Sequence, residues 1–510
     1  MERVEIVKGP ATLLYGSNAV GGVVNAISTH ESFLGQPFEG LRGQISSSTV
    51  SANGQAGGSF TSEYGFGDWM LWLGGGGQRS DDYQTPIGVI ENSKSRISNG
   101  SVELDWFGEK AFASIGYQGN DGRYGIPVAA TIEGGGESER VVDAVKVAFR
   151  QHGIRLTTGL KDLGSIVDSF QLSLNYSDWN HDELEIFDDG VQDVSTTFEN
   201  QQFVYRGVFT QNTNDRLSGS FGVWSRDRSF DTRGTEALSP PVDQNAFAVF
   251  GLEELSFDGV RLQLGGRVGY NRYVPSGDSS LPSLDFTGIS AGVGARFDVW
   301  EGGAFVANYT DSSRAPAMEE LYDFGPHIGN LTFETGNCTL GSERSHGPDF
   351  ALRHRRDRLQ GEINFFYYDI NNFVFLAPTG ATKDDLIEAE YAQEDARYSG
   401  TEMKLNVNVH ENLWINLAFD AVDTELKRTS ETLPRIPPLK GNDRTGYPIR
   451  RFECQTRARA RRPAGQGLQH RDGNPRLRPC EPDGFLHNPS SPFLSPPGLQ
   501  PLQRDRHAVP

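Results

Sequence analysis

The densest group of metal-ligating side chains lies between positions 181 and 189, in the run HDELEIFDD. This run holds one imidazole and five carboxylates within nine residues. Carboxylates attract a dication from a distance, and a neutral imidazole favours Zn²⁺ over Ca²⁺ or Mg²⁺. The run therefore predicts a metal site, while a solvated acidic loop is the simpler alternative. The candidate ligands are His181, Asp182, Glu183, Glu185, Asp188 and Asp189, with His327 and His346 as weaker candidates that would have to approach from elsewhere.

The sequence shows no constellation typical of an enzyme. The four glycines at 74–77 lead into polar residues and not into a helix, so they do not predict a phosphate loop. No H-E-x-x-H motif occurs. The chain has three cysteines, and no pair has the spacing of a zinc or redox site. We therefore predict no catalytic residue, no cofactor and no enzymatic activity.

Composition narrows the class of protein further. The 510 residues include 60 glycines, aromatic residues make up 11%, and hydrophobic residues reach only 36%. Such a balance is typical of many strands and turns. No run of eighteen apolar residues exists, but a strand of a membrane barrel needs only about 9–11 residues. The net charge of −20 argues against a nucleic-acid partner, which would require a basic stripe.

Between about residues 38 and 423 the chain reads as a long series of strands. In 170–177, FQLSLNYS, apolar residues alternate strictly with small polar ones. The same alternation recurs in 262–270, 403–409 and 413–420. A face of small polar residues suits a wet barrel interior opposite lipid, and aromatic residues gather near strand ends as at a membrane interface. We predict an all-β fold, a large antiparallel transmembrane β-barrel of roughly sixteen to eighteen strands.

The connections between these strands are uneven in length. Short turns such as 107–110 alternate with long polar segments, among them 178–195, 309–342 and 371–397. An outer-membrane barrel has short turns on one rim and long loops on the other, outside the cell. The metal-ligating run is therefore predicted to lie in an extracellular loop. A soluble β-sandwich, propeller or solenoid is the alternative, but no repeat of fixed period supports the last two.

The first 28 residues form a distinct motif. Val4–Val7 is β-prone, Lys8-Gly9-Pro10 breaks it, a compact apolar turn follows, and a glycine pair leads into the β-prone run 23–27. This stretch resembles the last part of the plug domain of TonB-dependent outer-membrane receptors. The positions that carry the resemblance best are Glu5, Lys8, Gly9, Pro10, Tyr15, Gly16, Gly21, Gly22 and Asn25.

A second stretch, 313–345, resembles the barrel signature R-x-P-x-x-x-E-L … G-N-x-x-L-x-x-E-x-S of the same receptors. The matching residues used here are Arg314, Pro316, Glu320, Leu321, Gly336, Asn337 and Glu343. ARYSGTE at 396–402 and LPRIPP at 433–438 resemble later elements of that family, in the correct order. The surroundings of the metal-ligating run are also similar, more weakly, to the zinc-importing branch of the family.

The resemblance implies three regions. Residues 1–30 would be the C-terminal remnant of a plug domain, 31–440 an incomplete transmembrane barrel, and 441–510 a tail outside the family. The tail is rich in arginine and proline and loses the alternation, which predicts a frame-shifted, disordered end. Met1 is followed by neither the apolar core nor the small-residue cleavage site of a signal peptide, so we expect a fragment whose start lies within a longer reading frame.

The resemblance also implies a function. A receptor of this family takes up a scarce ligand from outside the cell across the bacterial outer membrane, in contact with lipid and with a TonB-type energy-coupling complex. The segment that contacts that complex is missing here. The expected ligand is a metal or metal chelate, either an iron–siderophore complex or zinc. Alternatives are an ungated porin-like channel, an adhesin barrel and, less favoured, a soluble all-β carbohydrate-active enzyme.

Overall fold

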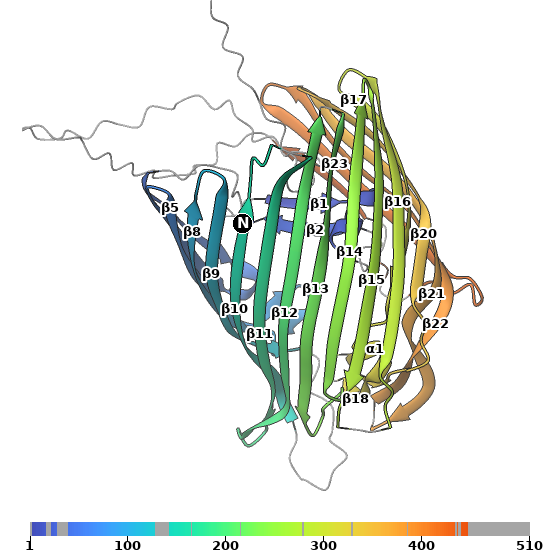
Figure 1. The fold of residues 1–510 in the computed structure, drawn as a ribbon. Coiled ribbons are helices and arrows are strands. Elements are labelled where there is room, and N and C mark those ends of the chain that lie inside the picture. The colour runs from blue at the N-terminus through green and yellow to red at the C-terminus, as the bar shows by residue number, and fades with distance from the viewer. Residues whose placement is uncertain are drawn as a thin grey trace, which may run out of the picture.

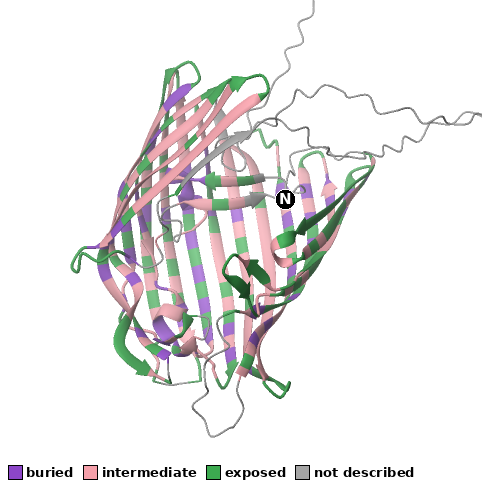
Figure 2. Cartoon of the chain, turned by 180° about the vertical axis from the view of Figure 1, so that it is seen from behind, coloured by how far each residue is buried: buried purple, intermediate pink, exposed green. Residues whose placement is uncertain are grey.

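The period-two pattern of the sequence becomes a wall with two unlike faces. In strand β14 (Val242–Phe257), side chains are alternately buried and exposed from Val242 to Phe250. Phe247 and Val249 are half exposed on one face, while Phe250 and Leu252 are buried on the other. Alternating bands of buried and exposed residues run along the strands in Figure 2. The exposed apolar face forms the outside of a barrel, and the buried face lines its interior.

The computed structural model describes residues 3–16, 22–27, 39–127, 142–164, 166–214, 216–277, 280–327, 330–384, 386–433, 436 and 440–446. Predictions for the tail beyond 446 lie outside this range. In the described part of the chain, no helix has the length and apolar character needed to span a membrane.

Two short strands, a 3₁₀ turn and the first barrel strands begin the chain. They are β1 (Arg3–Val7), η1 (Gly9–Leu14), β2 (Val23–Ile27), β3 (Gly40–Val50), η2 (Ser51–Asn53), β4 (Gln55–Phe66), β5 (Trp69–Ser80), β6 (Tyr83–Thr85), β7 (Gly88–Ile90), β8 (Ser95–Phe107) and β9 (Ala111–Ile126). The longest strands follow: β10 (Val142–Leu160), β11 (Val167–Phe187), β12 (Gln192–Asn214), β13 (Leu217–Gly234), β14, β15 (Val260–Pro275), β16 (Leu284–Trp300) and β17 (Gly303–Arg314).

The last part contains the single described α-helix and the remaining strands. These are α1 (Met318–Tyr322), β18 (Phe324–His327), β19 (Thr332–Thr335), β20 (Glu343–Arg356), β21 (Leu359–Lys383), β22 (Leu386–His410), β23 (Leu413–Leu426) and β24 (Lys440–Gly446). The predicted all-β architecture is confirmed. β24 extends the barrel beyond residue 440, where the sequence analysis places its end.

The barrel strands pair in chain order with antiparallel neighbours, and the ring closes through β24 beside β3. Apart from the short β18–β19 hairpin, eighteen described strands form the ring, the upper end of the predicted range. The sequence analysis expects an incomplete barrel, and the described strands nevertheless close. One pairing departs from the pattern, because β19 runs parallel to the start of β22.

The two rims differ in the length of their connections, as predicted, although the predicted long loop at 371–397 belongs mostly to β21 and β22. On one rim, tight turns such as 258–259 and 301–302 join β14 to β15 and β16 to β17; we call it the short-turn rim. On the other, the long-loop rim, β17 is joined to β20 by residues 315–342, which contain α1 and the β18–β19 hairpin. We call this connection the crossing loop. Figure 1 places α1 and β18 inside the barrel mouth at the bottom of the view.

The N-terminal segment lies inside the barrel. β1 and β2 pair as an antiparallel hairpin, with Arg3 opposite Ile27, and cross the interior roughly at right angles to the wall strands (Figure 1). Val7, Ala11 and Leu14 pack with Phe250 and Leu252 of β14 in one buried cluster. The turn η1 is therefore anchored on the wall formed by β14–β17.

Candidate functional site

A cavity of about 290 Å³ lies between the end of η1 and the crossing loop. Tyr15 and Gly16 line it from the N-terminal side, and Met318 and Glu319 of α1 line it from the long-loop rim. Inward-facing side chains of β13–β16 form its wall. The cavity thus joins the two regions that carry the family resemblance, which are far apart in the sequence.

Strand β13 supplies two of the cationic side chains of this cavity. In the run WSRDRSF, alternation puts Trp224, Arg226, Arg228 and Phe230 on one face. The guanidinium of Arg226 stacks over the Trp224 ring at 5.7 Å, and that of Arg228 over the Phe230 ring at 5.0 Å. Arg228 Nε also donates to Asn200 Oδ1 at 2.9 Å. Neighbouring aromatic rings therefore hold both arginines in position.

Two further arginines lie beside η1. Arg206 of β12 and Arg267 of β15 stack over the same Phe250 ring, at 5.4 and 5.7 Å. Arg206 Nη2 donates to the Leu14 carbonyl at 3.1 Å, and Arg267 Nη1 donates to the Leu13 carbonyl at 3.4 Å. The charges of Arg206 and Arg267 act on one another. Two like charges are thus held together at the end of a 3₁₀ turn.

This cationic group is poorly neutralised. Arg228 Nη2 lies 3.5 Å from Glu319 Oε1. In the described part of the chain, no carboxylate lies within 4.0 Å of Arg206, Arg226 or Arg267. Since a buried charge is costly unless it is paired, four arginines with one carboxylate partner leave a cavity that favours an anion.

Three buried polar atoms around the cavity have no hydrogen-bond partner among the described residues: Tyr15 Oη, Arg226 Nε and Arg267 Nε. Burial raises the pKa of Tyr15 to about 12, against the opposing influence of Arg206. The phenol therefore keeps its proton at neutral pH and can donate. Buried donors without acceptors are unusual, and an anion in the cavity would supply acceptors on this side of the barrel.

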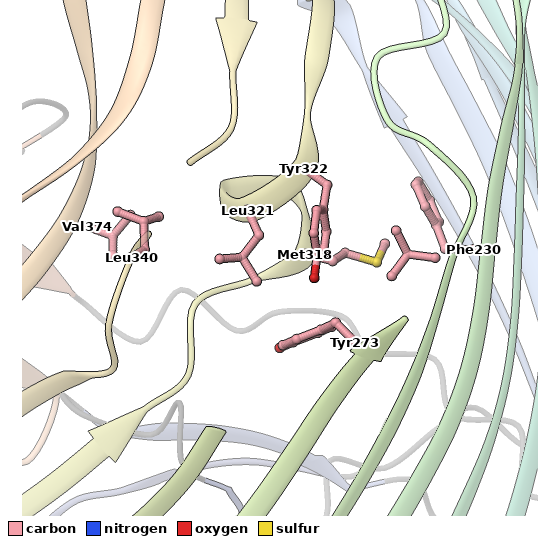
Figure 3. Packing of buried hydrophobic residues seen from close by; sticks show 8 residues of the cluster. Phe230, Tyr273, Met318, Leu321, Tyr322, Leu340 and Val374 are labelled. Carbon is pink, nitrogen blue, oxygen red and sulfur yellow. The ribbon is translucent and has the colours of Figure 1, made fainter. Parts of the chain in front are cut away.

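The crossing loop is fixed at its start by the family signature. Arg314 Nη1 contacts both carboxylate oxygens of Glu320, at 3.2 and 3.1 Å, and Arg314 Nε donates to Glu343. Glu320 also accepts the backbone N–H of Ala317 at 2.8 Å, which caps α1. The short helix then packs in two directions, as Figure 3 shows: Met318 lies toward Phe230, and Leu321 toward Leu340 and Val374.

The far side of the crossing loop is tied to other strands. Glu334 is almost completely buried and accepts hydrogen bonds from Asn330, Thr332 and the Tyr391 hydroxyl, at 2.9, 2.9 and 3.0 Å, and is paired with His327 Nδ1 at 2.9 Å. Burial alone would raise the pKa of Glu334, but the contact with His327 and the bonds from Asn330 and Thr332 outweigh it and lower the pKa to about 2.

A second carboxyl of the loop behaves in the opposite way. Asp323 is buried and accepts a hydrogen bond from the Ser239 hydroxyl of the β13–β14 connection. Burial, opposed by that bond and reinforced by the charges of Glu319 and Glu334, raises the pKa of Asp323 to about 8. The crossing loop therefore spans from the β13–β14 side to β22 and forms one wall of the cavity.

The prediction that the whole metal-ligating run lies in a loop is wrong, because most of the run belongs to a strand. Strand β11 continues to Phe187, so only Asp188 and Asp189 lie in the turn at its end. Alternation along a strand turns Asp182 to the face opposite His181, Glu183 and Glu185. These residues are polar on both faces of the strand, so the sequence pattern indicated a loop where β11 continues beyond the apolar belt.

The candidate metal ligands also have other partners. Trp179 Nε1 donates to His181 Nδ1 at 3.0 Å, and the His181 ring stacks on Phe198 at 4.3 Å. The Thr197 hydroxyl donates to Asp182 at 2.7 Å. Within the described ranges, no group of three or more His, Cys, Asp or Glu side chains is placed to hold a metal ion.

Of the two outlying histidines, one approaches the run. The charge of His327 acts on Glu183, as does that of Glu236. His346 of β20 pairs with Asp311 and Asp369 in the wall, on the face opposite the buried Glu343.

The motif residues of the N-terminal stretch bring η1 against the wall. Gly9 has φ of 73°, a conformation that favours glycine, and Pro10 begins the turn. Lys8 forms an ion pair with Glu402 of β22. Gly22 has φ of 146° and lies next to the Val7 carbonyl, while Glu5 and Asn25 are paired across the hairpin. Gly21 lies outside the described residues.

In the second signature, each residue has a structural reason. A Cβ on Gly336 would lie 2.6 Å from the backbone nitrogen of Tyr322, so the loop can return to α1 only through a glycine. Asn337 Nδ2 donates to the Tyr391 carbonyl at 3.1 Å. The Pro316 carbonyl accepts the hydroxyl of Tyr273 at 2.8 Å, and Leu321 is fully buried.

The sequence analysis did not identify the cavity arginines. The pair Arg226 and Arg228, spaced by two in an otherwise alternating strand, was the available signal. Arg206 and Arg267 are far from this pair in the sequence. Only the register of β12–β15 brings the four arginines together.

Comparisons with known proteins agree with this architecture. Residues 95–477 match the family model described as TonB dependent receptor-like, beta-barrel, and residues 1–23 match the TonB-dependent receptor plug domain. Among solved structures, the chain is similar to the copper transporter OprC, with a TM-score of 0.72 and 16% identity over 87% of this chain and 70% of that one.

Two further similar structures are iron and siderophore proteins by title. The FrpB iron transporter from Neisseria meningitidis gives a TM-score of 0.64 at 12% identity, covering 84% of this chain and 69% of that one. The siderophore receptor PirA from Pseudomonas aeruginosa gives 0.61 at 16% identity, covering 83% and 73%. With a family model matching most of its length, the chain belongs to the TonB-dependent receptors, which are transporters of the Gram-negative outer membrane and not enzymes.

Proposed function

We propose that this receptor imports an anionic metal chelate, which binds in the arginine cavity between η1 and α1. The observation that carries the proposal is the charge balance of the cavity. Arg226, Arg228 and Arg267 line it, Arg206 lies beside Arg267, and Glu319 is the one described carboxylate in contact with any of the four. A chelate with carboxylate or catecholate oxygens would satisfy these guanidinium groups by charge-assisted hydrogen bonds.

The same balance disfavours a bare dication at this place, because like charges repel it. The volume of about 290 Å³ is at the lower end of the range for ligand pockets. It suits a small chelate, or one arm of a larger one. The titles of the similar structures name copper, iron and siderophore cargo for those proteins, which supports a metal-containing ligand.

The remaining partners follow from the same proposal. Large apolar side chains such as Phe247, Val249 and Ile289 are exposed on the outward face and would contact membrane lipid. A TonB-type complex would supply the energy for release of the N-terminal segment.

Uptake of bare zinc is the competing candidate. It is favoured by the position of His327 near Glu183, at the long-loop end of β11. The cargo would then bind at this acidic end of the wall and not at the arginines.

Binding of three probes to the purified chain in detergent distinguishes these candidates. Ferric citrate is anionic, a ferric trihydroxamate is a neutral iron chelate, and zinc chloride supplies the bare cation. We expect ferric citrate alone to bind measurably by calorimetry. Loss of one charged hydrogen bond costs roughly 1.5–3 kcal/mol, so each cavity arginine should contribute at least about tenfold in Kd.

The decisive variant is Arg226→Gln with Arg228→Gln, which should weaken ferric citrate binding about a hundredfold or more. Arg233→Gln is the matched control on the same strand, because Arg233 is exposed and paired with Asp231 and Glu199 away from the cavity. Equal loss in the two proteins, or tight zinc binding with no response to ferric citrate, would contradict the proposal.

A further inference from the structure

We infer that Arg206 and Arg267 form a latch that holds η1 on the barrel wall, and that an anion in the cavity loosens it by taking Arg267. The inference rests on the proposed function for the identity of the anion, but the latch itself does not. Arg206 and Arg267 are positioning residues in this account, since they act through the turn that they hold.

The turn lies directly on the backbone of the wall. A Cβ on Gly292 would lie 3.2 Å from Pro10, and a Cβ on Gly265 would lie 3.1 Å from the Pro10 carbonyl and from Leu13. Absence of side chains at these wall positions brings the end of η1 within reach of arginines that project from the neighbouring strands. The close approach at Gly265 and Gly292 therefore determines which polar groups of η1 meet the wall.

Those polar groups are carbonyls. The last carbonyls of a short helical turn accept no hydrogen bond from within the turn, and they form the negative end of its dipole. Arg206 bonds to the Leu14 carbonyl at 3.1 Å, and Arg267 to the Leu13 carbonyl at 3.4 Å. The Arg206 guanidinium also lies 5.6 Å from the Tyr15 ring centroid. Two side chains of the barrel thus grip the end of the turn.

Arg267 is shared between the latch and the cavity. Its Nη1 reaches the turn over a long hydrogen bond. Arg267 also lines the cavity, and its Nε is buried without a partner among the described residues. A bidentate anion would engage two nitrogens of one guanidinium and add an ion pair, which the single bond to the neutral Leu13 carbonyl lacks. Occupancy of the cavity therefore draws Arg267 away from Leu13.

This competition links ligand binding to release of the turn, and linkage makes the effect reciprocal. An anion should loosen η1, and any change that loosens η1 without touching the cavity should tighten anion binding. Lys8→Gln provides such a change, because Lys8 holds the segment through Glu402 on β22. Removing a positive charge by itself would weaken anion binding, so a rise in affinity can come only from the linkage.

Hydrogen exchange measured by mass spectrometry on the full chain in detergent tests the latch. The reporter is the amide of Tyr15, which bonds to the Thr12 carbonyl at 3.0 Å within the turn. Without any ligand, Arg206→Gln should speed its exchange about tenfold. Arg261→Gln, an exposed arginine at the start of β15, should leave the exchange unchanged.

The second arm uses ferric citrate and, as an iron-free anion, pyrophosphate. Either probe should speed exchange of the Tyr15 amide in the unaltered chain, and neither should do so in Arg267→Gln. Lys8→Gln should bind ferric citrate a few-fold more tightly. Normal binding with unchanged or slower exchange overturns the latch and leaves the proposed function standing. Absence of binding by both probes refutes the proposed function and the coupling together, while unchanged exchange in Arg206→Gln overturns the latch alone.

Discussion

At the scale of single residues, Glu319 is the carboxylate that would weaken binding of the proposed anion in the cavity. Its carboxylate lies 3.5 Å from Arg228 and is the described acidic neighbour of the arginine group. It projects from α1 into the cavity lining and is partly exposed. Its charge therefore opposes the entry of an anion while it stabilises Arg228.

Replacing that carboxylate by an amide should strengthen anion binding. We expect Glu319→Gln to bind ferric citrate about three- to tenfold more tightly, because one unfavourable charge at the site is removed. Calorimetry at two salt concentrations measures this, and the gain should shrink at high salt. Glu254→Gln, near the short-turn rim, is the matched control; a weaker affinity in Glu319→Gln would show that Glu319 positions Arg228 more than it repels the ligand.

At the scale of elements, the crossing loop is stabilised by two carboxyls with opposite responses to pH. The pKa of Asp323 is raised from 3.8 to about 8, so its contribution to stability is full below pH 3.8 and is lost as the pH rises through 8. The pKa of Glu334 is lowered from 4.5 to about 2, so its contribution is full above pH 4.5 and is lost as the pH falls through 2.

The crossing loop should therefore be most stable near pH 4–5 and should open more readily toward pH 9. Asp323→Asn keeps the shape of the side chain without its charge. The loop of this variant should therefore lose about 1–3 kcal/mol less stability than the unaltered loop when the pH is raised to 9. Exchange of the Asp323 and Gly336 amides, corrected for the intrinsic effect of pH, reports this opening. An identical pH profile in the variant would show that Asp323 is not the responsible group.

A second prediction at this scale concerns Gly336, where the crossing loop returns to α1. Gly336→Ala would bring a Cβ within 2.6–2.7 Å of three backbone atoms of 321–323. Backbone cannot move aside cheaply, so we expect a loss of about 1–3 kcal/mol in local stability of the loop. Faster proteolysis within the loop than in the matched variant Gly341→Ala, whose Cβ would have room, would confirm it.

Much of the element-scale structure was predictable, because alternation determines a strand wherever lipid covers one side. The turn between Phe107 and Ala111 follows from local pattern. The family signature pointed to Arg314, Glu320 and Glu343, but their ion-pair network is seen only in the structure. The end of β11 did not follow from the sequence. Beyond the apolar belt both faces of a strand can be polar, so His181–Glu185 carries no period-two signal of burial.

The candidate site was less predictable for a different reason. Arg206, Arg226 and Arg267 lie on separate strands, and each looks like an ordinary surface arginine in the sequence. Their convergence depends on the register of three strand pairs and on the glycines that admit η1. Neither composition nor spacing along the chain carries that information.

At the scale of the whole molecule, the ring of strands is closed and has no free edge among the described residues. Closure pairs the backbone of every wall strand on both sides, which makes such barrels resistant to detergent. We expect the folded chain to migrate differently in a denaturing gel before and after boiling. A single mobility under both conditions, or recovery in the soluble fraction, would contradict a membrane barrel.

The orientation of the β1–β2 hairpin has a mechanical consequence. The two strands cross the interior roughly at right angles to the wall strands (Figure 1). A pull along the barrel axis on the start of β1 would load its hydrogen bonds one after another, beginning at the pair Arg3 and Ile27. The same pull would load the wall strands along their length, where many bonds share the force. The hairpin is therefore built to unzip at a tension that leaves the surrounding cylinder intact.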